Sequence, residues 1–155
     1  SYFLFTSSWL LAAFFLLMSA FLDALDGEIA REFKTASKMG DLLDHTLDRL
    51  ADVAFFVALA FNPVISVGNL AFFALIAVLL ASYVGTEAQA LTGKRLYTAI
   101  LGRGDRMIVL IIAPILQVFL HHHSMLLALY IILILSALTF FQRTYITTRM
   151  LKGKD

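Results

Sequence analysis

The sequence predicts an all-α protein, a polytopic bundle of transmembrane helices. Hydrophobic residues make up 61% of the 155 residues and charged residues only 15%, whereas a soluble domain is nearer half apolar and a quarter charged. The mean hydropathy is +0.87. Because so few polar side chains cannot cover a globule in water, we expect lipid to cover it instead. No linker-like stretch divides the chain, so residues 1–155 are predicted to form a single domain.

Five apolar segments are predicted to span the membrane, since a spanning helix needs roughly 20 mostly apolar residues. These segments are 2–25, 41–61, 67–90, 106–120 and 124–148. Asn62-Pro63 ends the second segment, and Pro114 predicts a kink in the fourth. The apolar runs are too dense for the in-and-out alternation of an outer-membrane barrel.

The charges fall on one side of this predicted topology. If the connections alternate between the two sides of the membrane, all 12 lysines and arginines and all 11 acidic residues lie on the side of segment 26–40. The positive-inside rule makes that side cytoplasmic. We therefore expect a multi-pass protein of the cell membrane whose N-terminus lies on the outer side, preceded by a helix that the sequence does not include.

Aspartates are concentrated beside the first connection. They are three residues apart on the first helix, and three, four and four apart on the second: Asp23 and Asp26, then Asp41, Asp44, Asp48 and Asp52. These spacings place each set on one helical face, where like charges repel and desolvation adds a cost. Mg²⁺ or Mn²⁺, which prefer hard oxygen ligands, would relieve that repulsion. Solvated helix ends are the alternative. His45 is expected to point to a different face, and the absence of cysteine excludes thiolate chemistry.

Eight residues in this region form one motif with fixed gaps. They read Asp23-x2-Asp26-Gly27-x2-Ala30-Arg31-x8-Gly40-x3-Asp44-x3-Asp48. The motif resembles, position for position, the signature of the CDP-alcohol phosphotransferase family. The resemblance implies an enzyme that transfers a phosphatidyl or archaetidyl group from a CDP-lipid to a second alcohol and releases CMP. It also implies six spanning helices, of which five are visible here, and a homodimer.

The resemblance assigns roles to the motif residues. The implied metal ligands, for one or two Mg²⁺ or Mn²⁺ ions, are Asp23, Asp26, Asp44 and Asp48. The implied CDP-binding residues are Asp23, Gly27, Ala30, Arg31 and Gly40. Asp48 is also the implied general base, which would take the proton of the acceptor hydroxyl. The transfer reaction needs no nucleophile from the protein, so we expect the acceptor hydroxyl to attack the β-phosphorus of the CDP-lipid directly.

Three arginines on the same side predict that the acceptor alcohol itself carries a phosphate. Arg103 and Arg106 flank a glycine-containing turn at a helix start, and Arg143 lies within the end of the last helix. Guanidinium groups suit bidentate phosphate binding. The stretch 82–90 and this turn resemble the branch of the family that uses inositol 1-phosphate, including the archaetidylinositol phosphate and phosphatidylinositol phosphate synthases. Glycerol 3-phosphate is the alternative acceptor.

Two other functional classes remain open. Intramembrane carboxylates also occur in cation and proton transporters, although a transport path would distribute them through the membrane depth. A structural membrane subunit would not explain the two acidic faces. The three histidines 121–123 lie on the opposite side and are interpreted as an interfacial cap. No nucleic-acid partner is expected.

Overall fold

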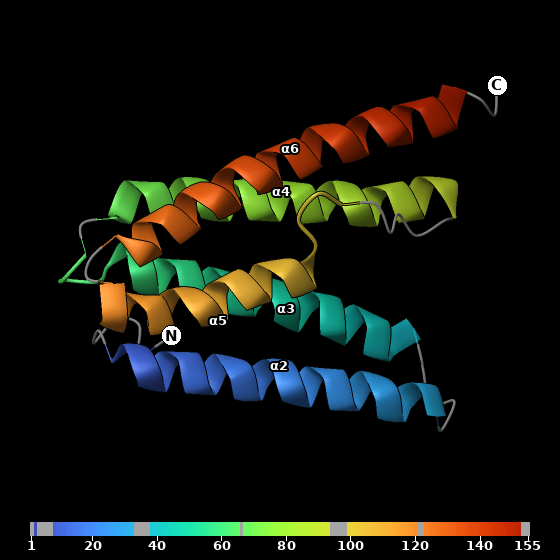
Figure 1. The fold of residues 1–155 in the computed structure, drawn as a ribbon. Coiled ribbons are helices and arrows are strands. Elements are labelled where there is room, and N and C mark those ends of the chain that lie inside the picture. Colours follow the sequence, from blue (N-terminus) through green and yellow to red (C-terminus); the bar gives the residue numbers. More distant parts are fainter. Residues whose placement is uncertain are drawn as a thin grey trace.

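The protein folds as a bundle of helices. The structure, a computed structural model, describes residues 2, 8–32, 38–65, 67–93, 99–120 and 123–152, and the side chains at 23–24, 26–32, 38, 41 and 120 lie outside that description. The helices are α2 (Trp9–Glu32), α3 (Lys38–Ala60), α4 (Gly68–Thr92), α5 (Arg103–Leu120) and α6 (Ser124–Lys152). These five long helices, with no strand in the described ranges, confirm the predicted fold class (Figure 1).

The helix boundaries differ from the predicted spans mainly at polar ends. α2 continues to Glu32, past the predicted end at residue 25, because backbone hydrogen bonds continue a helix where the side chains become polar. The predicted break after α3 is present: the Asn62 side-chain oxygen accepts hydrogen bonds from the backbone N–H groups of Val64 and Ile65, at 2.8 and 3.0 Å. Pro114 lies inside α5.

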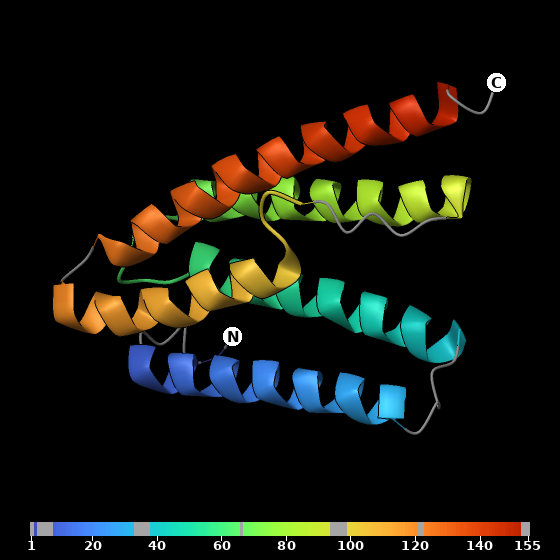
Figure 2. The same cartoon turned by 45° about the vertical axis from the view of Figure 1, so that its right-hand side comes forward.

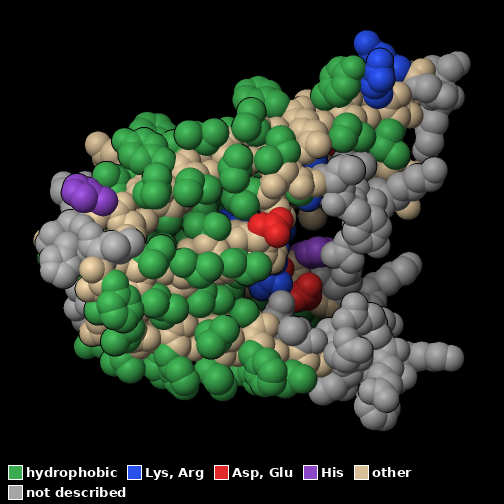
Figure 3. Space-filling model, in the orientation of Figure 1, with side chains coloured by type: hydrophobic (Ala, Val, Ile, Leu, Met, Phe, Trp, Pro, Cys, Tyr) green, Lys and Arg blue, Asp and Glu red, His purple; other side chains and the backbone are tan. Residues whose placement is uncertain are grey.

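The helices pack in pairs that are not all neighbours in the sequence. α4 packs against α6 and α3, and α5 packs against α2 and α6. Figures 1 and 2 show the last turns of α3 and α5 and the first turns of α4 and α6 at one end of the bundle, and the last turns of α2, α4 and α6 at the other. In both views α5 begins well short of that second end. A cavity lined by residues of α3, α4, α5 and α6 opens there, and Figure 3 shows the hollow, which we call the recess.

The core lies away from the recess. Fully buried side chains from three helices, Phe56, Leu59, Val78, Leu129 and Ile132, pack together there. Two polar side chains within the bundle accept backbone hydrogen bonds: Thr139 accepts from the N–H of Leu101 at 3.0 Å, and Gln117 accepts from that of Met125 at 3.0 Å. These bonds satisfy backbone groups at two interhelical connections, as a buried site requires.

The outer surface is apolar around most of the bundle. Figure 3 shows hydrophobic side chains covering the face in view, and charged side chains gathered toward the end where α6 ends. Large exposed side chains include Phe14, Phe21, Phe73 and Phe141. Within the described residues, α4 and α6 are long and apolar enough to cross a membrane, and 9–22 is a shorter apolar helix. α3 and α5 are not among these two helices, because charged side chains occupy the first half of α3 and the first turn of α5.

A buried ion pair joins α5 to α3. Arg106 Nη2 donates a hydrogen bond of 2.8 Å to Asp52 Oδ2, and the two residues are only 4% and 7% exposed. Arg49 lies 3.9 Å from the same carboxylate oxygen. A buried charge that loses its partner keeps its desolvation cost and loses the compensating attraction. The pair therefore holds the two helices in one alignment.

We expect Asp52→Ala to lower the free energy of unfolding by about 3–5 kcal/mol, because it leaves the Arg106 charge buried without its carboxylate. Thermal unfolding in detergent measures the loss, with Glu87→Ala as the control, since Glu87 is exposed on α4. Equal midpoints for the two variants would show that the pair does not hold α3 against α5.

Candidate active site

The recess contains a polar cavity of about 220 Å³. Four helices and the turn before α5 contribute to its wall. The lining residues are Asp44, His45, Asp48, Arg49, Ala81, Ser82, Gly85, Thr86, Gln89, Leu101, Gly102, Arg103, Arg106, Ser136 and Arg143. Figure 3 shows acidic, basic and histidine side chains in the hollow at this end of the bundle. The cavity therefore brings together the second half of the aspartate motif and the three predicted arginines.

The α3 side of the cavity offers a possible metal site. One ligand atom each from Asp44, His45 and Asp48 lies within 4.8 Å of the others. Asp48 is buried, whereas Asp44 is exposed. Two carboxylates and an imidazole are suitable donors for a divalent cation such as Mn²⁺, and the carboxylates suit Mg²⁺. The donor set thus fits the predicted divalent metal ion.

His45 belongs to this group, contrary to the interpretation from the sequence that it points to a different face. Residues one apart on a helix are indeed about 100° apart. The imidazole is long enough, however, for one of its nitrogens to approach the carboxylates on either side. On α3 the cavity is lined by Asp44 and Asp48 and, about 100° further around the helix, by His45 and Arg49.

The first half of the motif is only partly described. Asp23, Asp26, Gly27, Ala30 and Arg31 are on α2 by their backbone, but their side-chain surroundings lie outside the described residues. Gly40 is exposed in the first turns of α3. The predicted contributions of these residues to metal and CDP binding therefore stay predictions.

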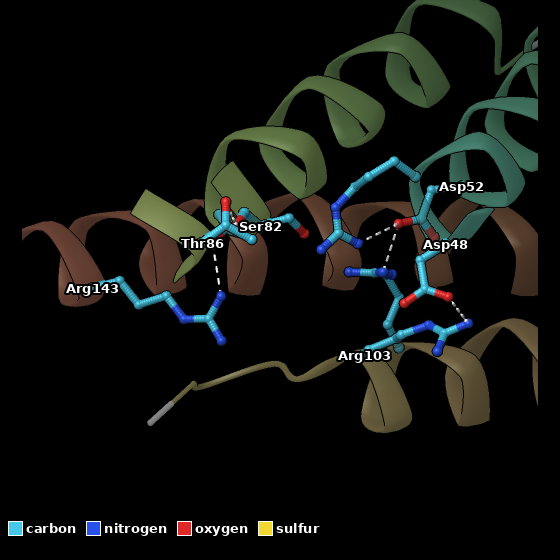
Figure 4. Close-up of polar contacts among 9 residues, drawn as sticks. Asp48, Asp52, Ser82, Thr86, Arg103 and Arg143 are labelled. Carbon is cyan, nitrogen blue, oxygen red and sulfur yellow. Dashed lines mark hydrogen bonds and ion pairs between the residues drawn. The ribbon is translucent and has the colours of Figure 1, made fainter. Parts of the chain in front are cut away.

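Asp48 pairs with a cation from α5. Its Oδ1 forms an ion pair with Nη2 of Arg103, and Figure 4 shows the two side chains pointing toward each other. The turn that starts α5 presents this arginine, because the carboxylate of Asp105 accepts a 3.0 Å hydrogen bond from the backbone N–H of Gly102. The carboxylate thereby satisfies a backbone donor that precedes the helix. The predicted tight turn thus places Arg103 directly at the motif aspartate.

Arg143 enters the cavity from the opposite wall. Its Nη1 donates a 2.8 Å hydrogen bond to the backbone oxygen of Ala81 on α4, and Figure 4 shows the side chain beside Ser82 and Thr86. Arg106 is nearly buried, and its Nε has no hydrogen-bond partner among the described residues. The sequence-predicted trio of arginines therefore lines one cavity.

Arg49 is a fourth arginine of the wall, which the sequence analysis did not include among the candidate site residues. Arg49 directly follows Asp48 in the sequence, and this position next to a motif aspartate was the signal that could have identified it. Among the described lining residues, four arginines face two aspartates. The surplus of positive charge favours an anionic ligand.

A second cavity of about 210 Å³ lies between α2, α3 and α5. Its wall is mostly apolar and includes Phe15, Leu16, Phe55 and Leu110. Asp48 and Arg103 line this cavity as well as the polar one. The ion pair therefore lies where a polar and an apolar space meet.

Comparisons with known proteins agree with this geometry. The model of the CDP-alcohol phosphatidyltransferase family matches residues 1–142. Archaetidylinositol phosphate synthase of Pyrococcus horikoshii is 34% identical over 145 residues, 94% of this chain and 73% of that protein. Phosphatidylinositol phosphate synthase of Cutibacterium acnes is 37% identical over 111 residues, 68% of this chain and 50% of that protein.

A solved structure has the same fold. It is the crystal structure of Mycobacterium tuberculosis phosphatidylinositol phosphate synthase with CDP-DAG bound. The TM-score is 0.82, with 22% identity, over 94% of this chain and 76% of that one. The family model and the relatives together show that the chain belongs to the CDP-alcohol phosphatidyltransferase family.

Proposed function

We propose that the protein synthesises a membrane phospholipid by transferring a phosphatidyl or archaetidyl group from a CDP-lipid to a phosphorylated alcohol, with release of CMP. The observation that carries the proposal is the single cavity in which acidic side chains of α3 face arginines of α3, α5 and α6. Inositol 1-phosphate is the proposed acceptor, because relatives of the chain are named for inositol phosphate lipids. Glycerol 3-phosphate remains the alternative.

The motif aspartates would hold the metal. The proposed ligands of one or two Mg²⁺ or Mn²⁺ ions are Asp23, Asp26, Asp44 and Asp48, and His45 lies beside the last two. A bound divalent ion would neutralise charge on the pyrophosphate and on the departing CMP. The CDP group would contact Asp23, Gly27, Ala30, Arg31 and Gly40, as the family motif implies.

Asp48 would act as the general base. It would accept the proton of the acceptor hydroxyl, whose oxygen forms a bond to the β-phosphorus while the bond from that phosphorus to the CMP oxygen breaks. Its position supports this role, because Asp48 lines both the polar and the apolar cavity. The lipid end of the donor would lie toward the apolar cavity and the acceptor in the polar one.

The arginines would bind the phosphate of the acceptor. Arg103, Arg106 and Arg143 line the same cavity, and the buried Nε–H of Arg106 is a donor without a partner among the described residues. A phosphate there would offset the repulsion among the guanidinium groups and would orient the acceptor hydroxyl toward Asp48.

The setting of the enzyme completes the proposal. The family is integral to membranes, and the apolar outer surface agrees with that setting. The positive-inside rule supports an active site that faces the cytoplasm, and a homodimer is proposed from the family resemblance. Family membership favours an enzyme over the cation or proton transporter considered above.

We expect Asp44→Asn to weaken binding of Mn²⁺, because it removes one charged oxygen ligand from the group on α3. Calorimetry of the purified protein with Mn²⁺ measures the affinity. Glu87→Gln is the matched control, since it removes an exposed carboxylate outside the cavity wall. Undiminished affinity in Asp44→Asn would remove this residue from the metal site.

We expect Asp48→Asn to lower kcat by ~10²-fold or more, the usual scale for removing a positioned base. Binding of the CDP-lipid should persist, because the variant retains the other motif residues. Release of CMP from the CDP-lipid and inositol 1-phosphate measures turnover, with equilibrium binding of the CDP-lipid measured in parallel. Near-normal turnover would contradict the role of Asp48 as general base. Lost binding of the CDP-lipid would instead indicate that Asp48 serves chiefly as a metal ligand.

We expect Arg143→Ala to raise the KM for inositol 1-phosphate by about ten- to a hundredfold, since a hydrogen bond to a charged group contributes roughly 1.5–3 kcal/mol. The KM for the CDP-lipid should not change. Arg149→Ala is the control on the same helix, because Arg149 is exposed and lies over the Tyr145 ring.

Similar small losses for both substrates in Arg143→Ala and Arg149→Ala would instead indicate that the arginines serve to attract anionic lipid. A wild-type enzyme that prefers unphosphorylated inositol over inositol 1-phosphate would refute the phosphate pocket outright.

A further inference from the structure

We infer that Gly85 on α4 is a positioning residue that determines where the Arg143 guanidinium lies in the cavity, and hence how the phosphate of the acceptor is held. The inference rests on the proposed function. Gly85 is in the interior of α4 and lines the cavity. Glycine inside a helix is destabilising relative to alanine, so its presence there calls for a local reason.

The contact with Arg143 supplies that reason. A Cβ added at Gly85 would lie 2.7 Å from Nη1 of Arg143, 3.2 Å from its Cζ and 3.8 Å from its Nε. The guanidinium group therefore lies across the glycine, in space that any side chain would fill. From there its Nη1 reaches the backbone oxygen of Ala81, one helical turn earlier, at 2.8 Å.

The surroundings of the other glycines are different. Gly68 faces the backbone of Ala60 at 3.0 Å, and nothing lies within 4 Å of a Cβ at Gly93 or Gly104. Of Gly68, Gly85, Gly93, Gly102 and Gly104, only Gly85 faces the charged head of a proposed substrate-binding residue. That head is the end of a flexible side chain, so an added methyl group would displace the guanidinium and leave the two helices packed.

Displacement of the guanidinium of Arg143 would change both its orientation and the space left in the cavity. The hydrogen bond to Ala81 fixes one edge of the planar group and with it the orientation of the guanidinium plane at the cavity wall. A displaced guanidinium would lose that bond and occupy part of the cavity. The size of residue 85 thus controls acceptor binding through Arg143, without Gly85 itself touching the phosphate.

The test is Gly85→Ala, assayed with CDP-lipid and inositol 1-phosphate. The expected result is a KM for the acceptor raised by roughly tenfold, the effect of one charged hydrogen bond, with the KM for the CDP-lipid and the thermal midpoint kept. Gly104→Ala is the matched control. It is also a glycine-to-alanine substitution in a helix, and nothing lies within 4 Å of a Cβ added there. The double variant Gly85→Ala/Arg143→Ala should have the acceptor KM of Arg143→Ala alone, since Gly85 acts only through this arginine.

Three outcomes would overturn the inference: an unchanged acceptor KM in Gly85→Ala, additive effects in the double variant, or a thermal midpoint that falls below that of Gly104→Ala. A second measurement separates this inference from the proposed function. Inorganic phosphate should raise the thermal midpoint of the wild type and do so less in Gly85→Ala. If that difference appears while the wild type turns over no phosphorylated alcohol, the proposed function fails and the role of Gly85 stands.

Discussion

The buried pair of Asp52 and Arg106 joins α5 to α3, and the geometry of the site depends on it. Each charge would be costly to bury alone, so the two helices keep the one alignment that lets them meet. Asp48 precedes Asp52 by four residues and Arg103 precedes Arg106 by three, so the second pair lies one turn along both helices. The two ion pairs thus follow one another along α3 and α5, and the pair of Asp48 with Arg103 borders both cavities.

Three of the four arginines that line the cavity lie on other helices than the candidate metal ligands. α3 supplies carboxylates and a histidine that suit a cation, and the facing wall supplies guanidinium groups that suit a phosphate. The two sets meet at the ion pair of Asp48 with Arg103, and Arg49 lies on α3 itself. Under the proposed function, the pyrophosphate of the donor would lie on the α3 side of the cavity and the phosphate of the acceptor beside Arg106 and Arg143, with Asp48 between them. The surplus of arginines then balances a substrate that brings its own negative charge.

The sequence predicted where the helices lie and several residues that line the cavity, but it did not predict which side chains contact one another. Hydropathy located the five helices, and Asn62-Pro63 ended α3 as expected, because both signals are local. The end of α2 was wrong, since a helix can continue beyond the apolar run that reveals it. The pairing of Asp52 with Arg106, 54 residues apart, has no local signal, and neither has the contact of Gly85 with Arg143. His45 was misplaced because helical periodicity describes where a side chain starts and not how far it extends.

The short α5 explains how one site can serve two unlike substrates. Because this helix begins well inside the bundle, its first turn brings Arg103 to a depth where apolar side chains such as Phe15 and Phe55 line the neighbouring cavity. A water-soluble phosphorylated alcohol and a membrane-bound donor would otherwise remain separated by the boundary of the bilayer. At Asp48 the polar and the apolar cavity share a wall, so the reacting groups can meet there while the lipid chains stay in an apolar environment. The position at which α5 begins is therefore as important to the reaction as the residues that it carries.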